Sequence, residues 1–97
     1  MEARREKAKT LFQGQKFTEA IKEYQAILDE MEDGEHEKDK IAVNLGLCYF
    51  KLENYDEAIR SYKQAVRLNP NNSKAHYRLF KEYEELQNSQ SQVDFSY

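Results

Sequence analysis

The chain has 97 residues, of which 34% are charged and 39% hydrophobic, with three glycines, one proline, one cysteine and a net charge of −3. This composition favours amphipathic helices in one domain over sheets, and the net charge argues against a nucleic-acid partner bound through phosphates. No run approaches the ~18 apolar residues of a membrane span, no signal-like segment opens the chain, and a lone cysteine cannot form an internal disulfide. We therefore expect a cytoplasmic setting with no membrane partner.

Apolar residues that recur three and four positions apart predict five helices. The run Ala20, Ile21, Tyr24, Ile27 shows this spacing, and Pro70 follows the fourth helix as a stop signal. In chain order, the helices are expected near residues 2–13, 17–32, 39–52, 55–68 and 73–87.

The third and fourth predicted helices carry a distinctive spacing of small and aromatic residues. Counted from Asp39, the eighth, eleventh, twentieth, twenty-fourth and thirty-second places hold Gly46, Tyr49, Ala58, Tyr62 and Pro70. This pattern resembles the tetratricopeptide repeat, a unit of about 34 residues that folds as two antiparallel helices. Such repeats stack to bury their apolar faces, and the stack forms a concave groove. The resemblance implies an all-α fold of helix-turn-helix repeats, stacked as a short right-handed superhelix.

The same pattern occurs once before and in part once after this unit. Phe17, Ala20, Ile21 and Tyr24 reappear as Tyr55, Ala58, Ile59 and Tyr62, one period plus four residues later. We place the extra residues in the acidic connection Met31–Lys38, and we expect the acidic stretch Glu30–Asp39 to be a solvated connection. The predicted domain, residues 1–87, then comprises repeat one (1–34), an acidic insertion (35–38), repeat two (39–72) and a terminal helix (73–87). The polar tail, residues 88–97, is expected to be disordered.

The terminal helix has an apolar face without a predicted partner. Phe80 occupies the place held by Ala8 and Gly46 in the two repeats, and Tyr83 and Leu86 continue the same face. This face suggests an alternative function: a helical scaffold that self-associates or docks a helix or peptide of another protein. The chain would then be a monomer or a weak homodimer.

Basic residues and one amide are predicted to meet on the concave surface. Residues one period apart lie side by side on neighbouring first helices of stacked repeats, and residues four apart share one helix face. Like charges four apart destabilise a helix by roughly 0.2–0.5 kcal/mol, so their repetition indicates an anion site. The predicted site consists of Arg5, Lys9, Asn44, Lys74 and Arg78.

These five positions resemble the dicarboxylate clamp of co-chaperone tetratricopeptide domains, found in immunophilins, stress-induced organising proteins and a protein phosphatase. Three residues match that family's pattern, Arg5 is a conservative exchange, and Lys9 replaces an asparagine. The resemblance implies an adaptor that binds the C-terminal peptide Glu-Glu-Val-Asp of the 70- or 90-kDa heat-shock chaperones. The two carboxylates of the terminal aspartate would be held by this set.

A second group of residues is predicted to line the groove beside the clamp and to receive an apolar side chain of the peptide. It consists of Phe12, Leu47, Phe50, Lys51 and Tyr77, with Phe50 favoured because its twelfth place turns away from the partner helix. No nucleophile set, metal-ligand spacing or phosphate loop is evident, so we expect no enzyme activity, cofactor or metal. Cys48 is expected to be a buried small hydrophobe.

Overall fold

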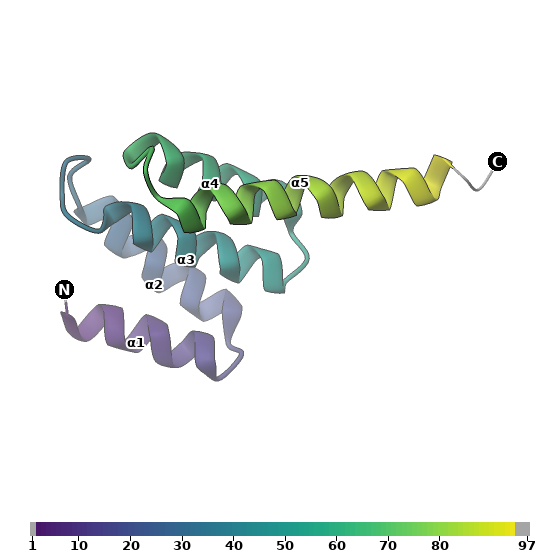
Figure 1. Ribbon diagram of the computed structural model, residues 1–97. Coiled ribbons are helices and arrows are strands. Elements are labelled where there is room, and N and C mark those ends of the chain that lie inside the picture. The colour runs from purple at the N-terminus through teal and green to yellow at the C-terminus, as the bar shows by residue number, and fades with distance from the viewer. Residues whose placement is uncertain (1, 95–97) are drawn as a thin grey trace.

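The computed structural model describes the backbone of residues 2–94 and the side chains of residues 3–87. Its elements are all helices, and each helix packs against the next one along the chain (Figure 1). This arrangement confirms the predicted all-α fold. The helices are α1 (Glu2–Gln13), α2 (Phe17–Glu30), α3 (Lys38–Lys51), α4 (Tyr55–Leu68) and α5 (Ser73–Asp94).

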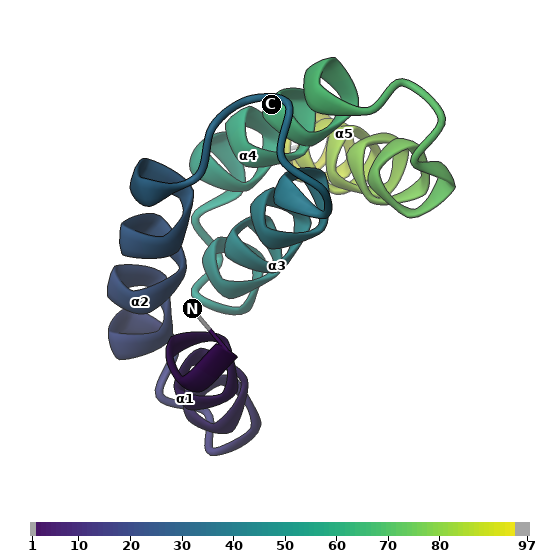
Figure 2. The same ribbon diagram turned by 90° about the vertical axis from the view of Figure 1, so that its left-hand side faces the viewer.

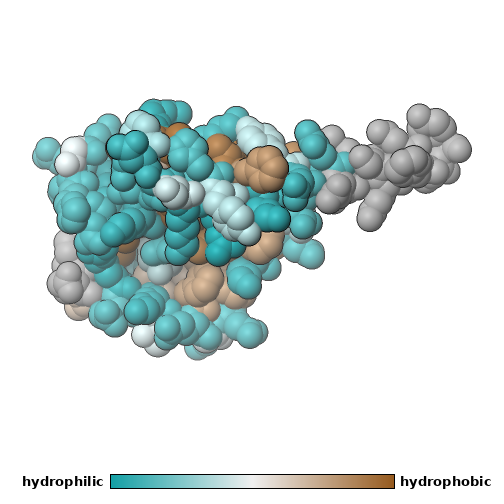
Figure 3. Space-filling model, viewed as in Figure 1, coloured by the Kyte–Doolittle hydropathy of each residue, from teal (hydrophilic) through white to brown (hydrophobic). Residues whose placement is uncertain are grey.

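The five helices form an arc of stacked pairs. Figure 2 shows α1, α3 and α5 along one side of the arc and α2 and α4 along the other. Hydrophilic side chains cover most of the face seen in Figure 3. No helix in the described part of the chain is both long and apolar enough to cross a membrane.

The loops that join α1 to α2 and α3 to α4 are copies of each other. In the first loop, the N–H groups of Gln15 and Lys16 donate to Phe12 and Leu11 at 3.0 and 2.8 Å. In the second, Glu53 and Asn54 donate to Phe50 and Tyr49, both at 2.9 Å. Each loop is a Schellman turn with one left-handed residue, Gln15 or Glu53 (φ 64° and 62°), and the two are offset by 38 positions. The offset equals the spacing of Ala20 and Ala58, so α1–α2 and α3–α4 are two versions of one helical hairpin.

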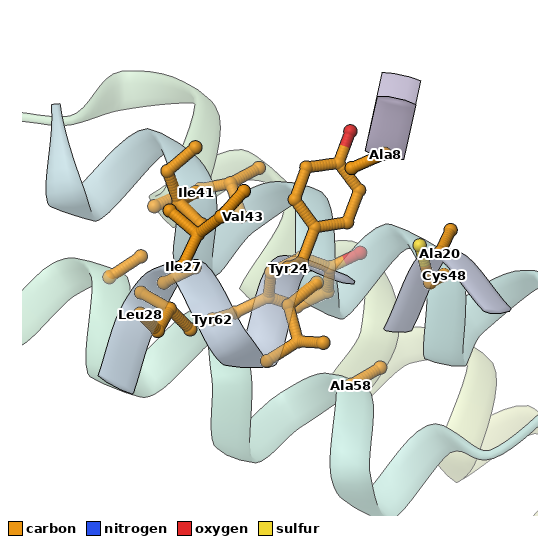
Figure 4. Close-up of a cluster of buried hydrophobic side chains, with 14 of the residues drawn as sticks. Ala8, Ala20, Tyr24, Ile27, Leu28, Ile41, Val43, Cys48, Ala58 and Tyr62 are labelled. Atoms are coloured by element: carbon orange, nitrogen blue, oxygen red, sulfur yellow. The ribbon is translucent and has the colours of Figure 1, made fainter. Parts of the chain in front are cut away.

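Small residues allow the helices to approach closely. Ala8, Ala20 and Ala58 are fully buried, and the ring of Tyr24 stands beside Ala8 (Figure 4). A methyl group added at Gly46 would lie 2.5 Å from Cε1 of Tyr62, a fully buried ring. Only glycine therefore fits where α3 crosses α4. The largest side chains that are fully buried are Ile27, Ile41, Val43, Cys48 and Tyr62.

The acidic connection between α2 and α3 is less solvated than the sequence suggested. Met31 and Lys38 are buried at its two ends. The Lys38 ammonium donates to the Met31 carbonyl at 3.0 Å and to the Asp33 carboxylate at 2.7 Å. This bond lowers the pKa of Asp33. The side chain of Lys38 thus folds back over the connection and holds its two ends together. The pattern of charges in the sequence does not reveal this contact.

The last helix is longer than predicted. It runs to Asp94, seven residues past the expected end at residue 87. The run Asn88–Gln92 is polar but contains neither glycine nor proline, so nothing in it stops a helix. Of the expected disordered tail, residues 88–94 continue α5, and residues 95–97 lie outside the described part of the chain.

Candidate functional site

A cavity of about 540 Å³ opens on the concave side, between α1, α3 and α5. Four of the five predicted clamp residues line it: Arg5 and Lys9 from α1, Asn44 from α3 and Lys74 from α5. Phe12 and Leu47 of the predicted second group also line it. The wall thus combines three cations, the amides of Asn44 and Gln13 and apolar surface, with Glu6 as its one carboxylate.

The basic residues of α1 fall into two groups according to the face they occupy. Arg4 and Lys7 form ion pairs with α2, at 2.7 Å to Glu30 and 3.2 Å to Glu23. Packing against α2 therefore accounts for these two cations. Arg5 and Lys9 lie on the cavity side of the same helix, where helix pairing does not account for them.

Arg5 has an acidic neighbour across the cavity rim. Its guanidinium lies 3.6 Å from Glu37, the residue that precedes α3, and Glu37 also lies 3.4 Å from Lys40. The bond from Lys40 and the charge of Arg5 lower the pKa of Glu37, so its carboxylate stays charged at neutral pH. Within residues 3–87, Lys9 and Lys74 make no such ion pair. Together with Arg5 they outnumber the Glu6 carboxylate in the cavity wall, so the wall carries net positive charge.

Asn44 and Lys74 also line a second hollow of about 440 Å³, between the start of α3 and the α4–α5 loop. The buried carboxylate of Asp39 lies here and accepts bonds from the amides of Asn69 at 3.1 Å and Asn72 at 2.6 Å. Burial acts to raise the pKa of Asp39, but these bonds outweigh it and lower the pKa. Asn72 in turn accepts from the Ala75 N–H at 3.0 Å and caps α5. The cap fixes the first turn of α5, which carries Lys74.

The structure does not bring Arg78 to the cavity. Arg78 is half-buried on α5, and its Nε is a buried donor without a hydrogen-bond partner. Its charge acts on Glu82 and on the Tyr62 hydroxyl, whose polar atoms are also buried without partners. Burial, with a smaller contribution from the charge of Glu85, raises the pKa of Glu82 to about 7, and the charge of Arg78 opposes the shift. The role of Arg78 in carboxylate binding stays a prediction.

The remaining members of the second group do not line the cavity. The Phe50 ring lies 6.1 Å from the ring of Tyr55, the first residue of α4. Phe50 thus packs towards the partner helix, and the reason for favouring it was wrong. Lys51 is exposed at the end of α3, and Tyr77 is exposed on the outer side of α5 under Lys81.

Four further residues line the cavity and were missed from the sequence: Glu6, Gln13, Tyr24 and Ile41. Gln13 could have been found, because it lies four positions after Lys9 on the same helix face. Tyr24 and Ile41 read as core residues by their periodicity, and both are indeed buried. Burial raises the pKa of the Tyr24 hydroxyl, so it stays protonated and can donate a hydrogen bond at the cavity wall.

The described residues offer little for chemistry. Cys48 is buried, and burial raises the pKa of its thiol to about 12, so it is not a thiolate at neutral pH. Among residues 3–87, no three His, Cys, Asp or Glu side chains lie close enough to hold a metal ion. What the site offers is a set of donors and cations in a concave wall.

Helical hairpins stacked in an arc, with alternate helices lining a hollow, define a helical-repeat protein. Comparison with family models identifies the hairpin itself: residues 40–72 match the tetratricopeptide repeat. The match covers α3 and α4 almost completely, as the spacing of Gly46, Ala58 and Tyr62 predicted. The chain therefore carries a tetratricopeptide repeat, which implies a protein–protein interaction module.

Proposed function

We propose that this protein binds the acidic C-terminal peptide of a 70- or 90-kDa heat-shock chaperone, of the Glu-Glu-Val-Asp type, and serves as a co-chaperone adaptor. One observation carries the proposal: Arg5, Lys9, Asn44 and Lys74, from three separate helices, line a single cavity. A C-terminal aspartate presents two carboxylates close together. The cavity offers it three cations and two amide donors, Asn44 and Gln13.

The energetics suit a moderate affinity. A hydrogen bond between charged groups contributes roughly 1.5–3 kcal/mol, and the site must be desolvated before the bond forms. Three or four such bonds, less the cost of ordering the peptide, correspond to a micromolar complex of roughly −7 to −9 kcal/mol. Phe12 and Leu47 supply the apolar surface against which a valine side chain of the peptide can pack. Because the cavity is open to solvent, binding should weaken as salt concentration rises.

Calorimetry with two forms of one peptide tests the carboxylate requirement. The free acid should bind, whereas the C-terminal amide, which lacks the terminal charge, should bind at least tenfold more weakly. Equal affinity for the two forms would exclude the clamp. The proposal of a general protein-interaction module would survive that result.

A pair of matched variants then locates the site. Lys74→Ala should cost more than ~1.4 kcal/mol of binding free energy, a tenfold loss. Lys22→Ala removes the same charge from an exposed position on α2 that lines neither cavity, so it should leave affinity unchanged. Equal losses in both variants would indicate binding by net charge alone.

Lys9 separates this chain from the clamp pattern, which has asparagine at that place. In Lys9→Asn a charged donor is replaced by a neutral one at the same point of the wall. We expect binding to persist with a weaker salt dependence, because one cation is gone while the donor remains. Lys9→Ala removes both and should bind more weakly than Lys9→Asn.

A further inference from the structure

The outer face of α5 is exposed and partly apolar. Tyr77 and Phe80 are 56% and 63% exposed, and Tyr83 is 39% exposed, although Phe80 replaces the small residue of the other repeats. Figure 3 shows a small brown area over the middle of this helix, among pale and teal side chains. Buried residues of α5, such as Ala75 and Glu82, face α4 instead. Lys63 of α4 lies 5.6 Å from the centroid of the Tyr83 ring, at one edge of the patch formed by the three exposed rings, and Phe80 is the most exposed of the three.

The charges of α5 run against its own dipole. A helix favours acidic residues near its N-terminus and basic ones near its C-terminus, but the first turn of α5 has no acidic residue and the last turn no basic one. The order is instead basic, then acidic: Lys74, Arg78 and Lys81 come before Glu82, Glu84 and Glu85.

This order is complementary to itself when the helix is reversed. Lys74 lines the concave cavity, and Arg78 and Glu82 lie on the side of α5 that meets α4, so the outer face carries Lys81 and Glu84 of this series. In an antiparallel pair of α5 helices, Lys81 of each copy meets Glu84 of the other, and the two dipoles oppose. A parallel pair would bring like charges together. A twofold pair is also the commonest form of self-association in soluble proteins.

We propose that the outer face of α5 binds a second copy of this chain as an antiparallel helix pair. A twofold axis between Lys81 and Glu84 leaves Phe80 of one copy about two residues, or ~3 Å along the helix axis, from the level of Tyr83 of the other. It also brings Lys81 beside Glu84 twice. Within one chain these two groups already lie 3.8 Å apart, so they can exchange partners at little cost.

The size of the patch determines the strength of the pair. The exposed parts of the three aromatic rings amount to on the order of 300 Å² per copy, below the ~800 Å² per partner of a standard interface. The dimer should therefore be weak, with a dissociation constant in the high-micromolar range. The inference does not depend on the proposed peptide site, because Phe80, Lys81, Tyr83 and Glu84 line neither cavity of the concave side.

Sedimentation equilibrium from micromolar to millimolar concentration tests the proposal. The average mass should rise towards twice the monomer mass and fall back when salt is added. Phe80→Glu should remain monomeric throughout, with an unchanged circular dichroism spectrum and unchanged peptide affinity. A constant monomer mass of the unaltered chain, or equal association of Phe80→Glu, would overturn it.

Two charge reversals test the orientation. Lys81→Glu and Glu84→Lys each place like charges across the proposed axis, so each variant alone should associate at least threefold more weakly. Mixed in equal amounts, they restore opposite charges at both contacts and should associate at least as well as the unaltered chain. A mixture that associates no better than its components would exclude the antiparallel pair, as would association of the unaltered chain that strengthens with salt.

Discussion

The guanidinium of Arg5 on α1 lies 3.6 Å from the carboxylate of Glu37, which immediately precedes α3. The two residues are 32 positions apart in sequence, and their pairing links the first repeat to the start of the second at the rim of the cavity. Glu37 is held there with a left-handed backbone, at φ 70°. A peptide carboxylate that approaches Arg5 must therefore compete with a carboxylate already in place.

Replacing that competitor should strengthen binding. Glu37→Gln keeps the size of the side chain but removes its charge, so we expect roughly threefold tighter binding of a peptide with a free C-terminus at low salt. Calorimetry at low and high salt measures the effect, which should shrink as salt is added. Glu35→Gln is the control, because Glu35 is exposed in the same connection and lines neither cavity. If Glu37→Gln binds as weakly as Glu35→Gln, Arg5 makes no contact with the peptide.

The positions of the helices could be predicted from the sequence because each one buries an apolar stripe. The first residues of α1, α2, α4 and α5 were predicted correctly, and the start of α3, at Lys38, was predicted to within one residue. The end of α5 was missed because a polar run signals a lack of packing, which is a different property from a lack of helix. The pairing of Arg5 with Glu37 was also missed, since it depends on the path of a connection that has no period.

The site residues that could be predicted are those at equivalent positions of successive repeats. Arg5, Lys9, Asn44 and Lys74 lie at register positions of the first helix of each unit, so the fold alone brings them to one wall. Phe50 and Arg78 also hold register positions, but their side chains turn to Tyr55 and towards Glu82. Register fixes where a Cα lies, whereas the direction of a long side chain depends on its neighbours.

The contact between Gly46 and Tyr62 predicts that Gly46→Ala destabilises the fold, the opposite of the usual effect of replacing a helical glycine by alanine. Alanine in a helix interior normally stabilises by about 1 kcal/mol relative to glycine. In Gly46→Ala the new methyl would lie 2.5 Å from a buried ring that cannot move away, so we expect a net loss of about 1–3 kcal/mol. Urea denaturation measures it. Gly34→Ala, where nothing lies within 4 Å of the added methyl, should leave stability close to that of the unaltered chain.

Asn72 holds the α4–α5 loop and the start of α5 together, and its loss should affect both stability and binding. Asn72→Ala removes the bond to Asp39 at 2.6 Å and the cap on the Ala75 N–H at 3.0 Å. We expect this loss to lower the free energy of unfolding by about 1–2 kcal/mol. Peptide affinity should fall as well, because the cap fixes the turn that carries Lys74. Asn71→Ala is the matched control, since Asn71 is exposed and bonds only through its backbone N–H. An unchanged unfolding midpoint in Asn72→Ala would contradict the role of the cap.

The buried carboxyl of Glu82 should make stability depend on pH. It is 3% exposed on the face of α5 that meets α4, and burial raises its pKa to about 7, above the usual value of 4.5, with Glu85 adding to the shift and Arg78 opposing it. The folded chain therefore holds this proton more tightly than the unfolded chain does. Its stabilising contribution is complete below about pH 4.5 and is lost as pH rises through about 7.

Glu82→Gln separates this effect from general titration, because glutamine resembles the protonated carboxyl and does not ionise. The variant should match the unaltered chain at about pH 4 and be more stable by on the order of 1–2 kcal/mol at about pH 8. Urea denaturation across this range measures the difference. Glu84→Gln, at an exposed position two residues further on, should show no such divergence with rising pH. A Glu82→Gln curve that stays parallel to that of the unaltered chain from acid to alkaline pH would mean that Glu82 ionises equally easily in the folded and unfolded states.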